Sequence, residues 1–201
     1  MTFLIRIVLS IILLSSCELP RFDYPYIDLW NDALFRKDIS VDEVFIEESK
    51  FSFIKVSYKK NDAIFILSSV NNEGVFTWVG SNYEIIKTYN GLILESSGLF
   101  PDTSIHAGDQ LKITSTKFQE PLYSFYLDID EPELLSLPVT YTLKSKKVLQ
   151  GELAMFFERS SPIIGWVAQD KYWYRDGIIV RSEISITPLE PSIKIEFFYK
   201  Y

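Results

Sequence analysis

From residue 51 onward, apolar and polar side chains alternate along the chain with a period of two. The alternating runs lie at residues 51–58, 63–70, 75–79, 83–89, 92–96, 123–129, 172–174, 178–180 and 193–197. Asn90-Gly91 and Asp176-Gly177 each join two such runs. A type I′ turn needs positive φ at both central positions, so these dipeptides are strong signals for antiparallel hairpins. The chain from residue 51 onward is therefore predicted to form antiparallel β structure.

Roughly ten to twelve strands fit this pattern. A sheet of that many strands curls or closes, because a flat open sheet leaves unpaired edges. We predict a mainly β fold, an antiparallel meander closed into a barrel or curled into a half-barrel. Residues 27–37 (IDLWNDALFRK) place Ile27, Trp30 and Leu34 on one helical face. This spacing predicts a short N-terminal helix packed on the sheet.

Several stretches interrupt the alternation. Lys60-Asn61-Asp62 is read as a turn, and residues 98–108 (GLFPDTSIHAG) are predicted to form a loop. Pro132 and Pro138 bracket a second irregular excursion. Residues 41–48 fit either a helical turn or a strand.

The first seventeen residues, MTFLIRIVLSIILLSSC, have the order of a secretory signal. One positive charge, Arg6, precedes a short apolar run, and small residues lead to Cys17. The run is too short to span about 30 Å of hydrocarbon as a helix. Residues 14–17 (LSSC) also resemble the bacterial lipobox, in which cleavage precedes a lipid-modified cysteine. An ordinary signal peptide with a coincidental cysteine is the alternative.

The lipobox interpretation divides the chain into three parts. Residues 1–16 form the signal peptide, 17–26 a lipidated tether, and 27–201 a single β-rich periplasmic domain. Several acyl chains on Cys17 bind a membrane far more strongly than the single chain that gives marginal binding. Glu18 in place of an aspartate favours export to the periplasmic face of the outer membrane, with the protein lipid-anchored there.

Composition excludes several classes of function. The sequence has a net charge of -7 and a pI near 4.8, which removes the basic surface that nucleic-acid binding needs. One cysteine and one histidine exclude zinc ribbons, disulfide scaffolds and haem attachment. We expect no cofactor, no metal and no nucleic-acid partner.

The sequence does not single out a catalytic group, and we expect a protein that is not an enzyme. His106 is the only histidine, and it lies near Ser104, Asp102 and Asp109 in the predicted loop. An exposed loop histidine is its ordinary interpretation, against a place in a catalytic triad. The acidic residues at 128–133 lack the spacing and the glycine of an EF-hand. Pairs of carboxylates are too common in this chain to identify a glycosidase.

The aromatic residues give the candidate binding surface. Trp30 and Trp78 lie in apolar patterns and are assigned to the core. Trp173 points to the opposite face of its strand from Tyr172 and Tyr174. Together with Trp166, these three form a candidate platform for sugar rings or a partner protein. Burial inside the barrel is the competing interpretation.

The net charge of the domain limits which partners it can bind. Removal of residues 1–16 leaves 19 basic residues against 27 acidic ones. Such a domain repels anionic polymers unless a local basic patch exists. Lys144, Lys146 and Lys147 form the one such cluster in the sequence, and a solubilising strand edge is the alternative interpretation.

Three stretches resemble a known family, the YjbF/GfcB-type lipoproteins of group 4 capsule and exopolysaccharide operons. They are residues 30–41 (WNDALFRKDISV), 78–93 (WVGSNYEIIKTYNGLI) and 172–182 (YWYRDGIIVRS). The resemblance implies an outer-membrane lipoprotein encoded beside polysaccharide assembly and export genes. It also implies a β-rich, barrel-like fold and no established catalytic residues.

We therefore expect a non-catalytic binding module with an accessory role in assembly or secretion of a capsule or exopolysaccharide. Its partners would be the membrane, through the N-terminal acyl chains, and polysaccharide export proteins or the polysaccharide itself. A lipid or lipoprotein carrier with an apolar half-barrel cavity is the first alternative. A glycan-modifying hydrolase is the second.

Overall fold

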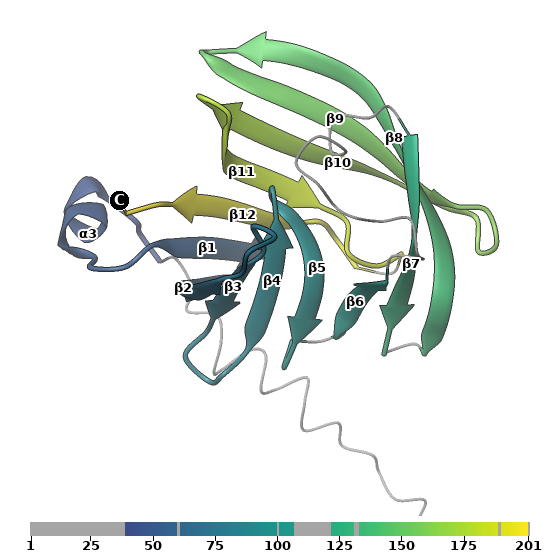
Figure 1. Ribbon diagram of the computed structural model, residues 1–201, viewed down its shortest axis with the longest axis horizontal. Helices are drawn as coiled ribbons and strands as arrows, with labels where there is room; N and C mark the ends of the chain where they lie inside the picture. The colour runs from purple at the N-terminus through teal and green to yellow at the C-terminus, as the bar shows by residue number, and fades with distance from the viewer. Residues whose placement is uncertain are drawn as a thin grey trace, which may run out of the picture.

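The chain folds into a closed antiparallel β-barrel (Figure 1). The computed structural model describes residues 39–59, 61–99, 101–106, 122–130, 133–188 and 190–200. Within these residues, twelve strands follow one another around the barrel in chain order, and β1 closes the ring by pairing with both β2 and β12. The strands are β1 (Phe53–Tyr58), β2 (Asn61–Val70), β3 (Phe76–Val79), β4 (Ile85–Tyr89), β5 (Leu92–Ser97), β6 (Thr103–His106), β7 (Leu122–Ile129), β8 (Leu134–Leu149), β9 (Glu152–Ser161), β10 (Trp166–Arg175), β11 (Ile178–Ile184) and β12 (Ile193–Phe198). The prediction of a mainly β antiparallel meander is confirmed, and of its two predicted forms the structure has the closed barrel.

The two predicted hairpin turns are present. Asn90 and Gly91 have φ of 46° and 86°, and Asp176 and Gly177 have φ of 52° and 81°. These positive values are those that a type I′ turn requires at both positions. Gln150-Gly151 makes a third turn of this kind between β8 and β9.

The meander gives the barrel two distinct ends. Because successive strands run in opposite directions, every connection into an odd-numbered strand lies at one end. We call this the proximal end. It carries the start of β1, the turns before β3, β5, β9 and β11, and the end of β12. The opposite, distal end carries the turns before the even-numbered strands.

The interior is packed with apolar and aromatic side chains. Trp78 is fully buried, as predicted, and its indole Nε1 donates to Thr88 Oγ1 at 2.8 Å. On β12, Ile193, Ile195 and Phe197 are buried while Lys194 and Glu196 are exposed. This alternation is the direct result of successive side chains pointing to opposite faces of a strand. Trp30 lies outside the described residues.

A short helix, α3 (Glu43–Glu48), precedes the barrel. Asp42 caps it by accepting from the Phe45 backbone N–H at 2.8 Å. Phe45 packs edge-on against Phe53, whose ring stacks on Phe198 across the β1–β12 seam. The helical alternative for residues 41–48 is therefore the correct one. The predicted helix at 27–37 lies outside the described residues.

Three local predictions are wrong. Residues 103–106 of the predicted loop form β6, a strand of four residues that is too short to reveal a period of two. Pro138 lies within β8 opposite Tyr126. A register shift near Leu127 and Ile129, with a positive φ at Ser136, accommodates the irregularity beside this proline.

The third error concerns the turn between β1 and β2. Asn61 and Asp62 already belong to β2, where they pair with Tyr58 and Ser57. The positive φ of Lys59, 56°, places the turn one residue earlier than predicted. Ser57 Oγ donates to Asp62 Oδ1 at 2.7 Å, which stabilises this register.

The β4–β5 turn lies against the opposite wall of the barrel. A Cβ atom at Gly91 would lie 2.8 Å from Ile179 Cγ1 and 3.1 Å from Tyr172 Cδ1. Tyr174 donates its hydroxyl to the Asn90 carbonyl at 3.1 Å. Two distant parts of the sheet therefore meet at the proximal end.

Gly91→Ala tests this close approach. It should lower the free energy of unfolding by about 1–3 kcal/mol more than Gly151→Ala, because both positions have positive φ but only Gly91 faces packed side chains. Urea denaturation of the two variants gives the difference. Equal losses would contradict the packing of this turn against β10 and β11.

The surroundings of Tyr58 at the distal end predict that the stability of the protein depends on pH. The Tyr58 hydroxyl donates to Glu190, and Lys59 forms an ion pair with the same carboxylate. Burial, and then Glu190, raise the pKa of Tyr58 from its ordinary 10 to about 12. A group with a raised folded-state pKa loses its stabilising contribution as the pH rises. Between pH 10 and 12, the stability of the wild type should fall more steeply than that of Tyr58→Phe. The exposed Tyr83 supplies the control: Tyr83→Phe should follow the wild type in the same denaturation series.

Candidate functional site

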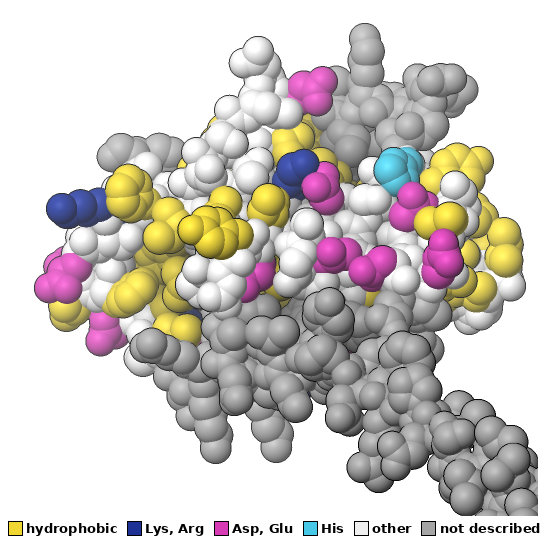
Figure 2. Space-filling model, turned by 90° about the horizontal axis from the view of Figure 1, so that it is seen from below, with side chains coloured by type: hydrophobic (Ala, Val, Ile, Leu, Met, Phe, Trp, Pro, Cys, Tyr) yellow, Lys and Arg dark blue, Asp and Glu magenta, His cyan; other side chains and the backbone are white. Residues whose placement is uncertain are grey.

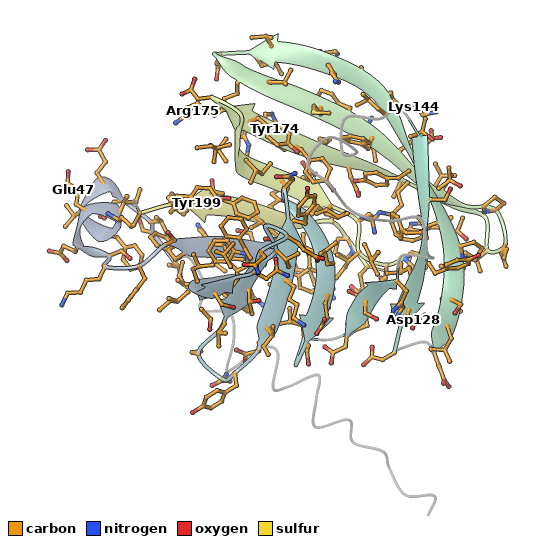
Figure 3. All side chains as sticks on the ribbon, in the orientation of Figure 1. Glu47, Asp128, Lys144, Tyr174, Arg175 and Tyr199 are labelled. Atoms are coloured by element: carbon orange, nitrogen blue, oxygen red, sulfur yellow. The ribbon has the colours of Figure 1, made fainter. Side chains whose placement is uncertain are left out.

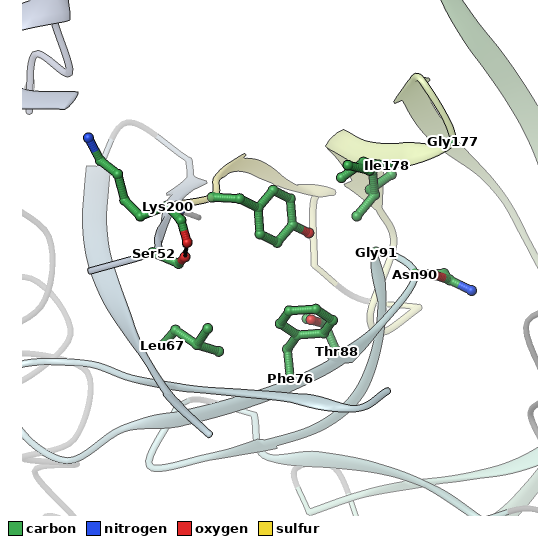
Figure 4. A pocket seen from close by; sticks show the side chains of 11 residues that line it. Ser52, Leu67, Phe76, Thr88, Asn90, Gly91, Gly177, Ile178 and Lys200 are labelled. Carbon is green, nitrogen blue, oxygen red and sulfur yellow. Dashed lines mark hydrogen bonds between the residues drawn. The ribbon is translucent and has the colours of Figure 1, made fainter. Parts of the chain in front are cut away.

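The proximal end of the barrel contains a pocket of about 380 Å³ (Figure 4). Its walls come from the segments that flank the first and last strands of the barrel and from two of the positive-φ turns. The lining residues are Ser52, Leu67, Phe76, Thr88, Asn90, Gly91, Gly177, Ile178, Ile179, Tyr199 and Lys200. Closure of the barrel is what brings these distant segments together.

One wall of the pocket is aromatic. Phe76 and Tyr199 line it, with ring centroids 5.8 Å apart in an edge-on arrangement. Behind them, Trp78 stacks on Phe76 at 5.7 Å and Phe197 stacks on Tyr199 at 6.2 Å. Rings held in this way present a rigid apolar surface, suited to the flat face of a sugar or to an aliphatic chain.

Polar groups frame the same space. Ser52 Oγ accepts from the Lys200 backbone N–H at 2.9 Å, which fixes the end of the chain to the start of β1. Tyr174 extends from β10 to the inner side of the sheet, as does Tyr199 beyond β12 (Figure 3). Burial, followed by the neighbouring Tyr199 and Tyr89, raises the pKa of Tyr174. Its hydroxyl therefore remains a neutral donor to Asn90.

A second polar cluster is buried farther inside, between β8, β9 and β10. Arg159 and Asp170 are almost completely buried, and Asp170 Oδ2 accepts from Arg159 Nε at 3.0 Å and from Nη2 at 2.7 Å. Tyr141 donates to the same oxygen at 2.6 Å, and the hydroxyl of Tyr172 lies 2.6 Å from that of Tyr141. The other oxygen, Oδ1, accepts from the Ser185 backbone N–H at 2.9 Å.

The surroundings keep this arginine charged. Burial alone would lower the pKa of Arg159, but the Asp170 carboxylate outweighs it and raises the pKa. The guanidinium carbon also lies 5.3 Å from the Tyr141 ring centroid and 5.7 Å from that of Trp166. Because both charges are paired and hydrogen-bonded, the cluster acts as an internal cross-link between β8, β9, β10 and the segment after β11.

The four residues of the predicted aromatic platform do not share one surface. Tyr172 and Trp166 are buried inside the barrel, and Tyr174 lies on the inner side as well. Trp173 faces outward, where Arg181 lies 4.2 Å from its ring centroid. The opposite orientation of Trp173 agrees with the alternation along β10. The other three residues of the predicted platform belong to the interior of the barrel.

Cys17 lies outside the described residues. The lysine cluster Lys144, Lys146 and Lys147 lies in β8, on the β8–β9 hairpin. Lys144 forms an ion pair with Glu158 at 2.9 Å, and Lys147 lies over the Phe156 ring at 5.6 Å.

The structure brings Ser104, His106 and Asp128 together on the outer face of β6 and β7. His106 Nε2 lies 3.0 Å from Ser104 Oγ and 2.8 Å from Asp128 Oδ2. A catalytic triad needs the serine and the carboxylate on different ring nitrogens, whereas here both contact the same one. Figure 2 shows the histidine on an exposed face among acidic side chains.

Asp128, the first residue of the acidic run, lies in β7 and has a structural partner. Asp128 Oδ1 accepts from the Ser136 backbone N–H at 2.6 Å, across the turn into β8. In the part of the chain that the structure describes, no group of three or more His, Cys, Asp or Glu residues is placed to hold a metal.

Sequence reasoning missed both the pocket and the buried ion pair. Arg159 and Asp170 occupy inward positions of their strands. A charged residue on the otherwise apolar face of each strand was therefore the sequence signal that could have indicated a buried ion pair. The pocket had no comparable signal, because its lining comes from six separate segments.

Comparison with known proteins gives a similarity of fold. No family model matches the sequence, and no curated protein matches it. The crystal structure of the hypothetical lipoprotein YmcC from Escherichia coli (K12) has a similar fold, with a TM-score of 0.63. The match covers 89% of this chain and 95% of that chain at 13% sequence identity. The likeness is therefore one of fold.

Among the residues described, no helix has both the length and the apolar character needed to cross a membrane.

Asp170→Asn tests the internal cross-link. It leaves the Arg159 charge buried without its counter-charge and should lower the free energy of unfolding by about 3–5 kcal/mol. Glu158→Gln is the control, because it removes one partner of the exposed Lys144–Glu158 pair and should cost less than about 1 kcal/mol. Denaturant titration of both variants makes the comparison, and similar losses would contradict the role assigned to the buried pair.

Proposed function

We propose that this chain is a lipoprotein of the YjbF/GfcB type, anchored through Cys17 to the periplasmic face of the outer membrane. In this proposal it has a non-catalytic, accessory role in assembly or secretion of a capsule or exopolysaccharide. The barrel acts as a binding module that holds a glycan segment or an export protein.

The observation that carries the proposal is the likeness of the whole barrel to a hypothetical lipoprotein, in a chain that begins with a lipobox-like sequence. The two features are independent, since the lipobox precedes the barrel in the sequence. Their combination supports a folded domain attached to a membrane by its N-terminus.

The pocket supports a binding role. Its volume of about 380 Å³ lies in the range of small-ligand sites, which combine apolar walls with a few polar groups. Phe76 and Tyr199 provide a stacking surface, and Asn90 lies at the edge of the same pocket. One sugar unit or one aromatic side chain of a partner is of suitable size and chemistry for this space.

The same pocket favours binding over hydrolysis. Glycoside hydrolysis generally uses two carboxylates about 5–10 Å apart across a groove. None of the described residues that line the pocket is an aspartate or a glutamate. The shared nitrogen in the Ser104–His106–Asp128 contact gives no support for acyl transfer either.

A lipid or lipoprotein carrier is the second candidate, and the apolar part of the lining favours it. Leu67, Phe76, Ile178 and Ile179 would contact an acyl chain, and Lys200 would lie near its charged end. The first candidate has more support, because the interior beyond the pocket is filled by packed side chains and the buried ion pair rather than by continuous apolar space.

Deletion of the gene with complementation by variants tests the proposal. Deletion should lower surface polysaccharide under inducing conditions, and the wild-type gene should restore it. Phe76→Ala/Tyr199→Ala should restore it poorly if the pocket binds the partner, while Tyr83→Ala at the exposed distal end should restore it fully. Unchanged polymer in the deletion strain would exclude the polysaccharide role.

Two further readouts separate the parts of the proposal. Mass spectrometry of the native protein should find cleavage before Cys17 and acyl groups on its sulfur, and Cys17→Ala should abolish both. Extraction of a stoichiometric lipid from the acylated wild type, absent from Phe76→Ala/Tyr199→Ala, would favour the carrier function instead.

A further inference from the structure

The hairpin between β8 and β9 exposes apolar side chains at its tip. Val148 is 76% exposed, Leu149 47% and Leu153 37%, around the Gln150-Gly151 turn. We call residues 146–153 the hairpin tip. Three large apolar side chains clustered on one protruding turn indicate an interaction surface more strongly than scattered exposed residues do.

The hairpin tip extends beyond the described part of the neighbouring strand β7. The pairing of β8 with β7 begins at Leu122 opposite Thr142, whereas its pairing with β9 continues to Leu149 opposite Glu152. Among the described residues, positions 145–149 of β8 therefore pair with β9 alone. Figure 1 shows this hairpin reaching outward on the same side of the barrel as α3.

The charge around the hairpin tip is opposite to that of the whole protein. The chain has a net charge of -7. Residues 144–158 of the hairpin and 175–181 around the adjacent β10–β11 turn contain five basic residues and three acidic ones. The basic residues are Lys144, Lys146, Lys147, Arg175 and Arg181, and the acidic ones are Glu152, Glu158 and Asp176.

Most of the acidic charge there is already paired. Glu152 binds Arg175 at 2.8 Å and Arg181 at 3.4 Å, and Glu158 binds Lys144. Lys146 and Lys147 are exposed and make no ion pair with the described carboxylates. These two lysines are therefore available to an anionic partner beside an exposed valine and leucine.

The kind of partner that the hairpin tip can reach depends on its position relative to the start of the barrel. Both lie at the proximal end. The 21 residues from 18 to 38 connect the proposed anchor at Cys17 to the described chain and can span at most about 70 Å. Because the chain enters the barrel at the proximal end, the anchor keeps this end within about 70 Å of a bilayer.

We propose that the hairpin tip docks on the anionic surface of the membrane that holds the acyl anchor. Val148 and Leu149 insert among the lipid headgroups, and Lys146 and Lys147 bind lipid phosphates. Adjacent apolar and cationic side chains are the combination that membrane-surface elements use. The inference rests on the lipid anchor of the proposed function, but not on the polysaccharide role.

An anionic polysaccharide is the competing occupant for the two lysines. It would bind them through charge alone and would leave Val148 and Leu149 exposed to water. A bilayer surface accounts for both the apolar and the cationic side chains, so the observations favour the membrane.

A fluorescent label on the acylated protein tests the docking. Since acylation blocks Cys17, the only native cysteine, Val148→Cys introduces a single reactive thiol for a polarity-sensitive probe. The labelled protein is reconstituted in phosphatidylcholine vesicles with and without phosphatidylglycerol. In the anionic vesicles, the emission should shift to the blue and increase about twofold or more. A probe at Tyr83→Cys, exposed at the distal end, should not respond.

Lys146→Gln/Lys147→Gln on the labelled protein should remove most of the shift, because each lysine near an anionic surface strengthens binding roughly fivefold. Lys194→Gln, an exposed lysine on β12, is the matched control and should leave the shift unchanged. High salt should reduce the shift.

Three outcomes would overturn the docking: no shift at position 148, an equal shift at position 83, or a shift produced by soluble polygalacturonate without anionic vesicles. Mass spectrometry of the same sample shows whether Cys17 is acylated. A missing acyl group would reject the anchor itself, whereas an acylated protein without a shift would reject the docking alone.

Discussion

Pairing of β1 with both β2 and β12 is the constraint on which the rest of the structure depends. It removes the exposed edges that an open twelve-stranded sheet would present, and it encloses every second side chain. A ring of this size encloses more space than small side chains fill. Large rings such as Trp78 occupy it, the β4–β5 turn reaches the opposite wall, and the Arg159–Asp170 pair links neighbouring strands. The pocket is a part of this enclosed space that stays open at the proximal end.

The sequence could predict the elements that local chemistry determines. Asn90-Gly91 and Asp176-Gly177 specify hairpins because few other dipeptides tolerate two positive φ angles. Elements that depend on neighbouring strands were not predictable. Thr103–His106 is a strand because β5 and β7 pair with it, and Pro138 is tolerated in β8 because a register shift lies beside it. The pocket depends on closure of the ring, so neither its lining nor its volume could be obtained from periodicity.

The aromatic residues of β10 show the same limit of prediction from sequence. Alternation correctly separated Trp173 from Tyr172 and Tyr174, yet it could not say which face of β10 is the inner one. That choice depends on the curvature of the sheet, and it turns three of the four platform residues inward. One inward tyrosine then serves the buried ion pair and another holds the Asn90 turn. Their aromatic character is explained by these hydrogen bonds inside the barrel before any ligand is considered.

The proximal end combines the start of the barrel, the pocket and the hairpin tip, and their common location has a physical consequence. A lipid anchor fixes a domain to the bilayer at one point only, whereas a second contact at the hairpin tip would restrict its tilt. The pocket would then lie on the side of the barrel nearest the membrane, within reach of molecules that emerge from the bilayer or move along it. The distal turns, where Tyr83, Ile163 and Val167 are exposed, would face the periplasm. A partner protein that meets this barrel from the periplasm would therefore contact a different surface from the one that binds a ligand in the pocket.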